Sequence, residues 1–369
     1  MLKVITTVGT SIFDNYVESS ESNLLDRDYL NNLYSEINEN KNKRIKDKIK
    51  KWIERINDRK QVSAEIKSLL KLKDEKQDKT LNVYLLATDT IASSLAAEII
   101  KEILEKEGLK VFYNPDNDVI KDLQMENTSL FVKHGLSNLV NRIELIADGY
   151  YGNVVFNITG GYKGIIPYMT IMGIINKCEI KYIYENSERL MSIPQLPLQI
   201  DEDFFEKNYN LLFVFEKGVE KYSEFKKSNF KVTDEMERRG LIEFVDNIAL
   251  LSPIGQILFQ NYKSKFFWFY CSDDVFEAIN RQVDIKRILQ EKFSTNYQDK
   301  TEYKNGHFVY DDGNNPNRIF YFEENSMIYI YKTFENHDEY EKYLRTPFSN
   351  ELKRDYIKES KLRKIERFN

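Results

Sequence analysis

Three short segments carry the residue types that a phosphate-bearing ligand requires. They are residues 9–11 (GTS), 88–90 (TDT) and 157–163 (NITGGYK). A glycine pair lets the backbone approach a phosphate and turn its amides toward it, hydroxyls supply hydrogen bonds, and a lysine supplies positive charge. These segments therefore form a candidate phosphodiester site. Its residues are Gly9, Thr10, Ser11, Thr88, Asp89, Thr90, Asn157, Thr159, Gly160, Gly161, Tyr162 and Lys163.

The segments do not form the common nucleotide-binding motifs. The P-loop pattern Gly-x-x-x-x-Gly-Lys-Ser/Thr does not occur in the chain, and Gly-x-Gly-x-x-Gly does not follow the first strand-like run. A nucleoside triphosphate or dinucleotide site is therefore disfavoured. A glycine pair taken alone is also typical of a tight turn between a strand and a helix.

Each segment follows a short run rich in Val, Ile and Tyr, which predicts a buried strand. The predicted strands are Leu2 to Val8, Leu81 to Ala87, Lys110 to Tyr113, Asn153 to Ile158 and Ile180 to Tyr184. Helical patterns lie between them, so the fold class is α/β, with a Rossmann-like, doubly wound parallel sheet. In such a sheet the carboxyl ends of the strands form the ligand-binding edge. All three segments are expected at that edge.

The segments TTVGTSIFDN, LLATDTIASSLAAE and NITGGYKGIIPYMTIMG, in this order and spacing, resemble the CARF domain of ancillary effectors of type III CRISPR systems. The resemblance implies a homodimer that binds a cyclic oligoadenylate across its two-fold axis. A ring of identical nucleotides presents the same groups to two identical patches. Cyclic tetra-adenylate is the expected allosteric activator, and no metal or other cofactor is expected.

Asp89 departs from this chemistry, because a carboxylate repels phosphate. We expect it to cap the helix that starts at Ile91, or to bind a ribose hydroxyl or an adenine amine.

The C-terminal third requires its own interpretation, because CARF domains are joined to varied effectors. The HEPN ribonucleases common in this family need Arg-x-x-x-x-His, but Ser, Glu and Lys stand five positions before His134, His307 and His337. A PD-(D/E)xK nuclease would place an acid two residues before a strand lysine to hold a divalent cation. Ile330 occupies that position before Lys332. The first class is excluded, and the second lacks its expected ligand.

The stretch HFVYDDGNNPNRIFYFEENSMIYIYKTFENHDEYEKYL is similar to RelE-type toxins. The resemblance implies metal-independent RNA cleavage, in which a ribose 2′-hydroxyl attacks the adjacent phosphate and side-chain cations stabilise the transition state. Arg318 matches the arginine at the start of a strand and would bind the phosphate in a bidentate manner. Lys332 and Lys304 are further candidate cations. Tyr340 and Tyr343 would stack on a base or move a proton.

Two acids weaken this match, since Asp311 and Asp312 stand where such toxins often carry basic residues. By resemblance to CARF-RelE proteins, the substrate would be messenger RNA engaged on the translating ribosome. The ribosome would then help to position the RNA.

The expected organisation has three parts. Residues 1–195 form the CARF domain, with a charged helical insertion at about 26–79 that projects from the sheet. Two prolines in residues 192–198 mark a boundary, and residues 196–263 form a winged-helix-like connector. Residues 264–369 form the RelE-like domain, in which strands RIFYFEE and MIYIYKTF meet at a tight turn at Asn325 and Ser326.

Composition limits the remaining classes of function. The formal net charge is −5, which argues against wholesale coating by nucleic acid but leaves room for local basic patches at Lys41 to Lys60 and Lys353 to Arg367. The first of these is more typical of a solvated helix face. Cys178 and Cys271 lie far apart, which indicates neither a disulfide framework nor a zinc site. No signal peptide or bilayer-spanning run is evident, so a cytoplasmic location without a membrane partner is expected.

Two other functions remain open. One is a ligand-responsive transcriptional regulator, in which the winged helix binds DNA. The other is a ring nuclease that degrades the cyclic oligoadenylate at the CARF site, with Thr10 or Ser11 positioning a ribose 2′-hydroxyl.

Overall fold

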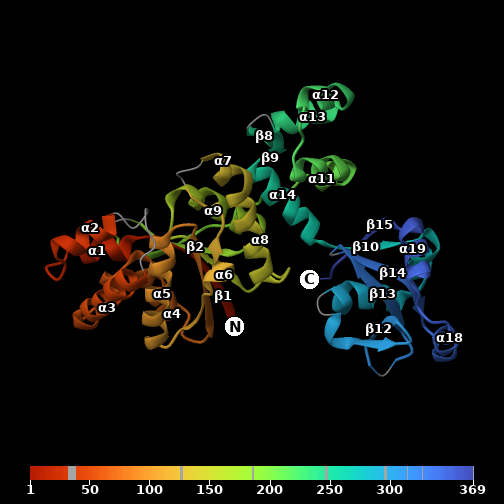
Figure 1. The fold of residues 1–369 in the computed structure, drawn as a ribbon, viewed down its shortest axis with the longest axis horizontal. Helices are drawn as coiled ribbons and strands as arrows, with labels where there is room; N and C mark the ends of the chain where they lie inside the picture. The colour runs from red at the N-terminus through yellow and green to blue at the C-terminus, as the bar shows by residue number, and fades with distance from the viewer. Residues whose placement is uncertain are drawn as a thin grey trace. The chain divides into compact units, whose positions relative to one another are not determined.

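The computed structural model describes residues 1–31, 39–124, 128–184, 187–245, 248–294, 297–313, 315–325 and 327–368. The chain divides into two compact units, residues 1–261 and 262–369 (Figure 1). Residues 196–261, for which the sequence suggests a connector, are grouped with the first unit. In the described ranges, every helix is too short or too polar to traverse a lipid bilayer.

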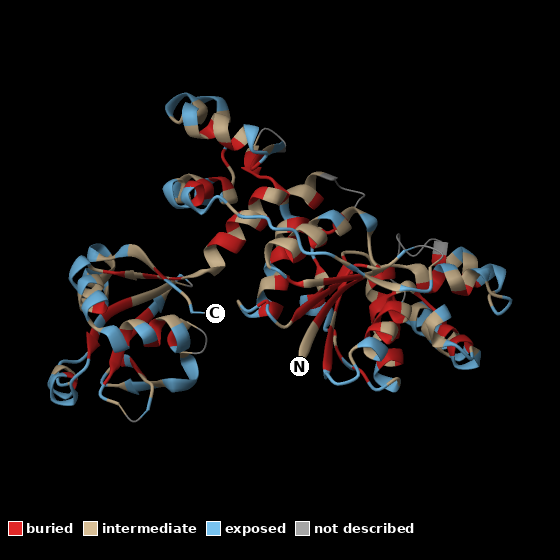
Figure 2. Cartoon of the chain, turned by 180° about the vertical axis from the view of Figure 1, so that it is seen from behind, coloured by how far each residue is buried: buried red, intermediate tan, exposed pale blue. Residues whose placement is uncertain are grey.

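The first unit is built on a largely parallel, Rossmann-like sheet. Its strands run in the order β3-β2-β1-β5-β6-β7, with β4 paired to β2 and β7 antiparallel to β6. Their β-branched residues are mostly buried along the central strands (Figure 2). The five predicted strands are confirmed. The bounds are β1 (Leu2–Val8), β2 (Leu81–Thr88), β3 (Lys110–Phe112), β4 (Val119–Ile120), β5 (Val154–Asn157), β6 (Glu179–Ile183) and β7 (Leu190–Ile193).

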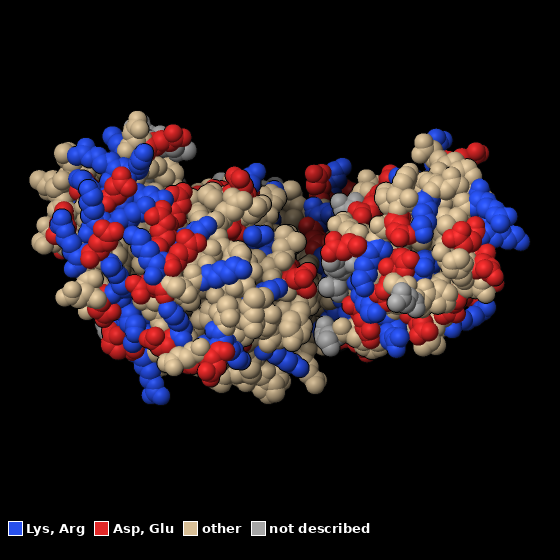
Figure 3. Space-filling view, turned by 90° about the horizontal axis from the view of Figure 1, so that it is seen from below, with Lys and Arg blue, Asp and Glu red and all other residues tan. Residues whose placement is uncertain are grey.

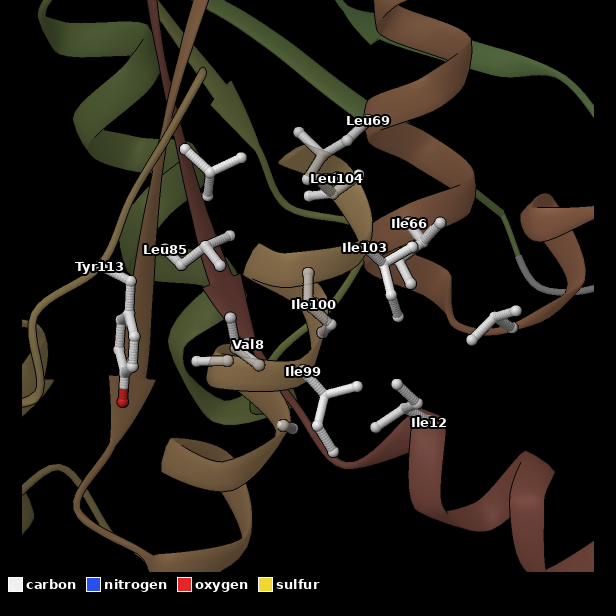
Figure 4. Packing of buried hydrophobic residues seen from close by; sticks show 14 of the residues in the cluster. Val8, Ile12, Ile66, Leu69, Leu85, Ile99, Ile100, Ile103, Leu104 and Tyr113 are labelled. Carbon is white, nitrogen blue, oxygen red and sulfur yellow. The ribbon is translucent and has the colours of Figure 1, made fainter. Parts of the chain in front are cut away.

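One face of this sheet is covered by helices that include much of the expected insertion. Ile45, Ile49 and Trp52 of α3 are buried in the same core as the sheet residues Val8 and Leu85. Figure 4 shows α4 against α5 in this core, with Leu69 beside Leu104 and Ile66 beside Ile103. The insertion therefore packs on the sheet instead of projecting from it. The helices are α1 (Ser11–Glu18), α2 (Leu24–Asn31), α3 (Glu39–Arg55), α4 (Ala64–Glu75) and α5 (Ile91–Lys106).

The opposite face carries a second core. Ile5, Leu86 and Phe156 of the sheet pack there with α8 (Leu136–Ala147) and α9 (Ile166–Ile175). Ile257 of α14 (Pro253–Ser264) belongs to the same cluster. The remaining helices of the unit are α6 (Pro115–Asp118), α7 (Thr128–Leu130), α10 (Glu202–Lys207), α11 (Tyr209–Lys217), α12 (Tyr222–Ser228) and α13 (Phe230–Arg238). Two short antiparallel strands of this unit are β8 (Ile242–Val245) and β9 (Ile248–Leu251).

The second unit has a sheet of order β11-β12-β13-β14-β10-β15. Its neighbouring strands are antiparallel, except that β10 and β14 are parallel. The predicted hairpin strands are confirmed as β13 and β14, and Asn325 between them has a φ of 51°. Ser326 of the predicted turn lies outside the described residues. The bounds are β10 (Phe266–Cys271), β11 (Thr301–Lys304), β12 (His307–Asp311), β13 (Arg318–Glu324), β14 (Met327–Phe334) and β15 (Lys361–Glu366).

Helices pack on both faces of this second sheet. Ile279 of α15 and Ile285 of α16 share one core with Phe269 and Ile330. Tyr340 of α18 shares the other with Phe320. The helices are α15 (Asp273–Arg281), α16 (Val283–Ile288), α18 (His337–Tyr343) and α19 (Asn350–Glu359).

Candidate functional site

The three predicted loops of the first unit meet at one cavity. Strands β1, β2 and β5 are adjacent and parallel, so their carboxyl ends lie at the same edge of the sheet. The cavity there has a volume of about 520 Å³. Its lining residues are Val8, Gly9, Thr10, Thr88, Thr90, Ser93, Leu123, Gln124, Gly161, Tyr162 and Lys163. The expected convergence of the loops is confirmed, whereas Ser11, Asp89, Asn157, Thr159 and Gly160 are not among the lining residues.

Lys163 is the exposed cation of this cavity. It begins a short 3-10 turn that leads into α9. Gly161, which precedes it by two residues, has a φ of 94°, a conformation that L residues rarely adopt. A Cβ at this position would overlap the Thr7 hydroxyl. The glycine is therefore required by the turn itself.

A buried carboxylate, missed in the sequence, holds two of the loops together. Glu65 in the first turn of α4 is 1% exposed. Its Oε1 accepts hydrogen bonds from the amides of Gly9 (2.8 Å) and Gly161 (3.2 Å), and its Oε2 accepts one from the Ser11 hydroxyl (3.0 Å). The glycine amides that were expected to face a phosphate are thus bonded to an internal anion. No local pattern signals this role, because Glu65 lies in a charged stretch.

Removal of the Glu65 carboxylate should destabilise the protein. Glu65→Ala leaves three part-buried donors without their acceptor. An unsatisfied donor costs about 1–3 kcal/mol when it is fully buried and less when water reaches it. We expect the free energy of unfolding, measured by chemical denaturation, to fall by about 2–5 kcal/mol. Glu54→Ala, at a largely exposed position on α3, should change it by less than about 0.5 kcal/mol. Equal effects of the two variants would contradict the assigned role.

Asn157 and Thr159 serve the fold of the loop instead of facing the cavity. The buried Asn157 amide donates to Thr6 Oγ1 (3.0 Å) and to Ser68 Oγ (2.8 Å). Its oxygen accepts a hydrogen bond from the Thr159 hydroxyl (2.9 Å), which in turn accepts one from the Ile183 amide (3.0 Å). These contacts tie the end of β5 to β1, α4 and β6.

The second loop is ordered by hydroxyls. Thr90 caps α5, since its Oγ1 accepts a hydrogen bond from the Ser93 amide (3.2 Å). The expectation that Asp89 caps this helix is therefore wrong. Asp89 Oδ2 accepts a hydrogen bond from the Asp122 amide (2.9 Å), and Asp89 lines a neighbouring cavity of about 560 Å³ together with Lys43. Thr90 lines both cavities.

In the second unit, Arg318 is buried and held from several sides. Its Nη2 lies 2.7 Å from Asp311 Oδ2, and its Nη1 donates to the carbonyls of Asn315 (2.7 Å) and Asn317 (2.8 Å). The guanidinium also stacks over the Tyr340 ring at 5.0 Å. Its Nε is buried without a hydrogen-bond partner in the described part of the chain. Asp311 and Arg318 are register partners on β12 and β13, which explains their contact.

Lys304 is the last residue of β11 and the register partner of His307. Lys304 Nζ is 2.5 Å from Glu302 Oε2, and this hydrogen bond raises the pKa of Lys304. The pKa of Glu302 is lowered, mainly by its hydrogen bond to Lys304 and to a smaller extent by the positive charge of Arg318. Burial raises the pKa of Tyr340, whereas the nearby Arg318 and Lys304 lower it. The structure therefore brings Arg318 and Tyr340 into contact, whereas Lys304 contacts Glu302.

The other two predicted residues are placed differently. Lys332 is exposed on β14 as the register partner of Phe320. Tyr343 packs against the core that contains Phe320, and its hydroxyl lies 2.9 Å from that of Tyr356. Burial raises the pKa of Tyr343, which makes it a poor base near neutral pH.

The neighbouring polar residues are engaged in contacts of their own. Asp312 is paired with Lys292 (2.6 Å) and Lys300 (3.0 Å). His307 is buried, with Nδ1 2.7 Å from the Tyr331 hydroxyl and Nε2 2.8 Å from the Thr346 carbonyl oxygen. Within the ranges given above, no group of three or more His, Cys, Asp or Glu side chains is arranged to hold a metal ion.

Part of the chain matches a known protein family. Residues 60–196 match the family model of a CRISPR-associated protein, Cas_APE2256. The matched stretch contains the loops at 88–90 and 157–163, and it begins after the loop at 9–11. This match supports a CRISPR-related role. No curated protein matches the chain at a significant level.

Proposed function

We propose that the chain is a cyclic-oligoadenylate-activated endoribonuclease of CRISPR defence. The observation that carries the proposal is the cavity at the carboxyl edge of β1, β2 and β5, where loops from three parts of the sequence meet. The match of residues 60–196 to a CRISPR-associated family supports it. Cyclic tetra-adenylate is the proposed activator.

The lining of the cavity suits a phosphodiester. Lys163 would pair with a phosphate, and the hydroxyls of Thr10 and Thr90 would donate hydrogen bonds to its oxygens. Because Glu65 occupies the amides of Gly9 and Gly161, the ligand is bound mainly by side chains. In the proposed homodimer, two such cavities would bind one ring across the two-fold axis.

The second unit is the proposed nuclease, by its resemblance to RelE-type toxins. Arg318 would stabilise the negative charge that develops when a 2′-hydroxyl attacks the adjacent phosphate, through the Nη2 group that contacts Asp311 in the structure. Lys304 stays protonated near neutral pH, because its hydrogen bond to Glu302 raises its pKa. The proposed substrate is messenger RNA, engaged on the ribosome.

A transcriptional regulator is the second candidate, favoured by the order of elements in residues 209–251. The order of elements is that of a winged helix. It consists of helix α11, a β-bridge between Val219 and Ala249, helices α12 and α13, and the β8-β9 hairpin. However, two cations at the C-terminal end of α13 are paired with acids, Arg238 with Asp234 and Arg239 with Glu235. This pairing argues against DNA binding by α13, which requires accessible positive charge. Figure 3 shows another face of the molecule, on whose described atoms basic and acidic side chains are interspersed.

The deciding experiment is RNA cleavage by the purified full chain with cyclic tri-, tetra- or hexa-adenylate, with and without ribosomes. We expect cleavage with the tetramer and none without ligand. On naked RNA, cleavage should survive EDTA, because side-chain cations supply the charge. Dependence on added metal would contradict the proposed chemistry. Degradation of the cyclic ligand without RNA cleavage would identify a ring nuclease. Salt-dependent binding to duplex DNA would identify a transcriptional regulator.

A further inference from the structure

A second feature of the C-terminal unit is an aromatic cavity of about 750 Å³. Tyr303 of β11, Phe308 of β12, Tyr321 and Phe322 of β13, and Phe348 before α19 contribute to its lining. The cavity lies near the end of β13, whereas Arg318 begins the same strand. It is therefore distinct from the Arg318 cluster.

Two of these rings are presented to solvent as a pair. Tyr303 is 69% exposed and Phe308 is 44% exposed. They are register partners on the antiparallel strands β11 and β12, with ring centroids 5.2 Å apart. Large apolar side chains gain about 25 cal/mol per Å² when they leave water, so an exposed ring pair in a hollow is suited to be covered by a flat, aromatic partner.

Polar groups that line the cavity indicate which kind of aromatic partner it can bind. Lys353 Nζ lies over the Phe322 ring at 5.4 Å and 2.5 Å from Glu324 Oε2. Glu323 also lines the cavity, and its Oε1 accepts a hydrogen bond from the Tyr297 hydroxyl (3.0 Å). The amide side chains of Gln298 and Asn350 also line the cavity. An amide offers both a donor and an acceptor, as the edge of a nucleobase requires, and an ammonium attracts the phosphate that accompanies the base.

We propose that this cavity binds unpaired nucleobases of single-stranded RNA by stacking on Tyr303 and Phe308. Aromatic platforms flanked by a cation are a general means of binding single strands. The proposal rests on the proposed ribonuclease function. It adds a subsite that receives a base some distance from the scissile phosphate, because Arg318 and Phe322 are separated by about 13 Å of strand. The subsite would influence where the RNA is cut.

The test measures binding apart from catalysis. A short, fluorescently labelled, single-stranded RNA of mixed sequence is titrated with the full chain, and its anisotropy is recorded. A strand of the same length and charge without bases is the second probe. Tyr303→Ala and Phe308→Ala should each weaken RNA binding about tenfold, since stacking contributes about 1–3 kcal/mol per base. Tyr303→Phe should bind as the unaltered chain does, because it keeps the ring.

Controls separate the possible outcomes. Tyr150→Ala removes an exposed aromatic side chain from the first unit, and it should leave RNA affinity unchanged. The strand without bases should bind Tyr303→Ala and the unaltered chain equally. Unchanged RNA affinity in both alanine variants would overturn the inference. Altered self-association of these variants in sedimentation, with normal RNA binding, would also overturn it and assign the surface to a second copy.

The failure of this inference and that of the proposed function are distinguishable. Ring-dependent RNA binding without any ligand-dependent cleavage would contradict the ribonuclease and leave the nucleobase site intact. Ligand-dependent cleavage with ring-independent binding would contradict the nucleobase site alone.

Discussion

Replacement of Arg318 by alanine should slow ligand-dependent RNA cleavage on the order of a hundredfold or more, the usual cost of losing one charge-stabilising donor. Arg318→Lys should restore little activity, because a point charge cannot reproduce the planar guanidinium. The measurement is single-turnover cleavage at saturating activator. Activator binding should stay normal in both variants, since the first unit is unchanged.

The ion pair with Asp311 provides the matched control for this prediction. Arg318→Ala and Asp311→Ala both break the same 2.7 Å contact between β12 and β13. If Arg318 acts only through its ion pair with Asp311, the two variants should lose activity to similar degrees. Their stabilities should differ in any case, because Arg318 also donates to the Asn315 and Asn317 carbonyls. If Arg318 binds the phosphate, Asp311→Ala should cleave at least as fast as the unaltered chain, because it frees Nη2 for the substrate. Equal losses in the two variants would therefore rule out the catalytic assignment.

Loss of the Lys163 cation should weaken the binding of cyclic tetra-adenylate by about 10-fold to 150-fold. A hydrogen bond to a charged group contributes about 1.5–3 kcal/mol, and each 1.4 kcal/mol is a factor of ten. The measurement is isothermal titration of Lys163→Ala with the ligand. The affinity should fall as salt rises in the unaltered chain, and less steeply in the variant.

Lys79→Ala is the control for this second prediction. Lys79 is exposed and precedes β2, so the change removes the same charge at the opposite edge of the sheet. Its ligand affinity should match that of the unaltered chain. Gly161→Val is unsuitable as a test, because its Cβ would meet Thr7 and its φ is positive. Wild-type affinity in Lys163→Ala would exclude the cavity as the binding site.

Much of the first sheet could be predicted because its central strands β1, β2 and β5 are buried on both faces. A buried parallel strand appears as a continuous apolar run, and the loop that follows it must lie at the carboxyl edge. The convergence of the loops that follow β1, β2 and β5 could therefore be predicted from local patterns, although Ser11 and Asp89 do not line the cavity. The helices α3 and α4 were harder, since their charged residues suggested solvent on all sides. Lys46 pairs with Glu98 and Glu102 on α5, while Ile49 faces the core.

The sequence by itself determined the helices and strands, and it determined which residue types follow the strands at the carboxyl edge of the first sheet. Backbone propensity and hydrophobic periodicity act over a few residues, so both can be recognised locally. Tertiary structure decided which groups are free to act. Glu65 reaches Gly9 across 56 residues and occupies its amide. The basic tail expected as a patch contributes Lys361–Glu366 as β15, since β10 provides its partner strand. Asp311 holds Arg318 through the register of two strands. These contacts join segments that are distant in the sequence and that meet only in the folded chain. They therefore cannot be predicted from local sequence patterns.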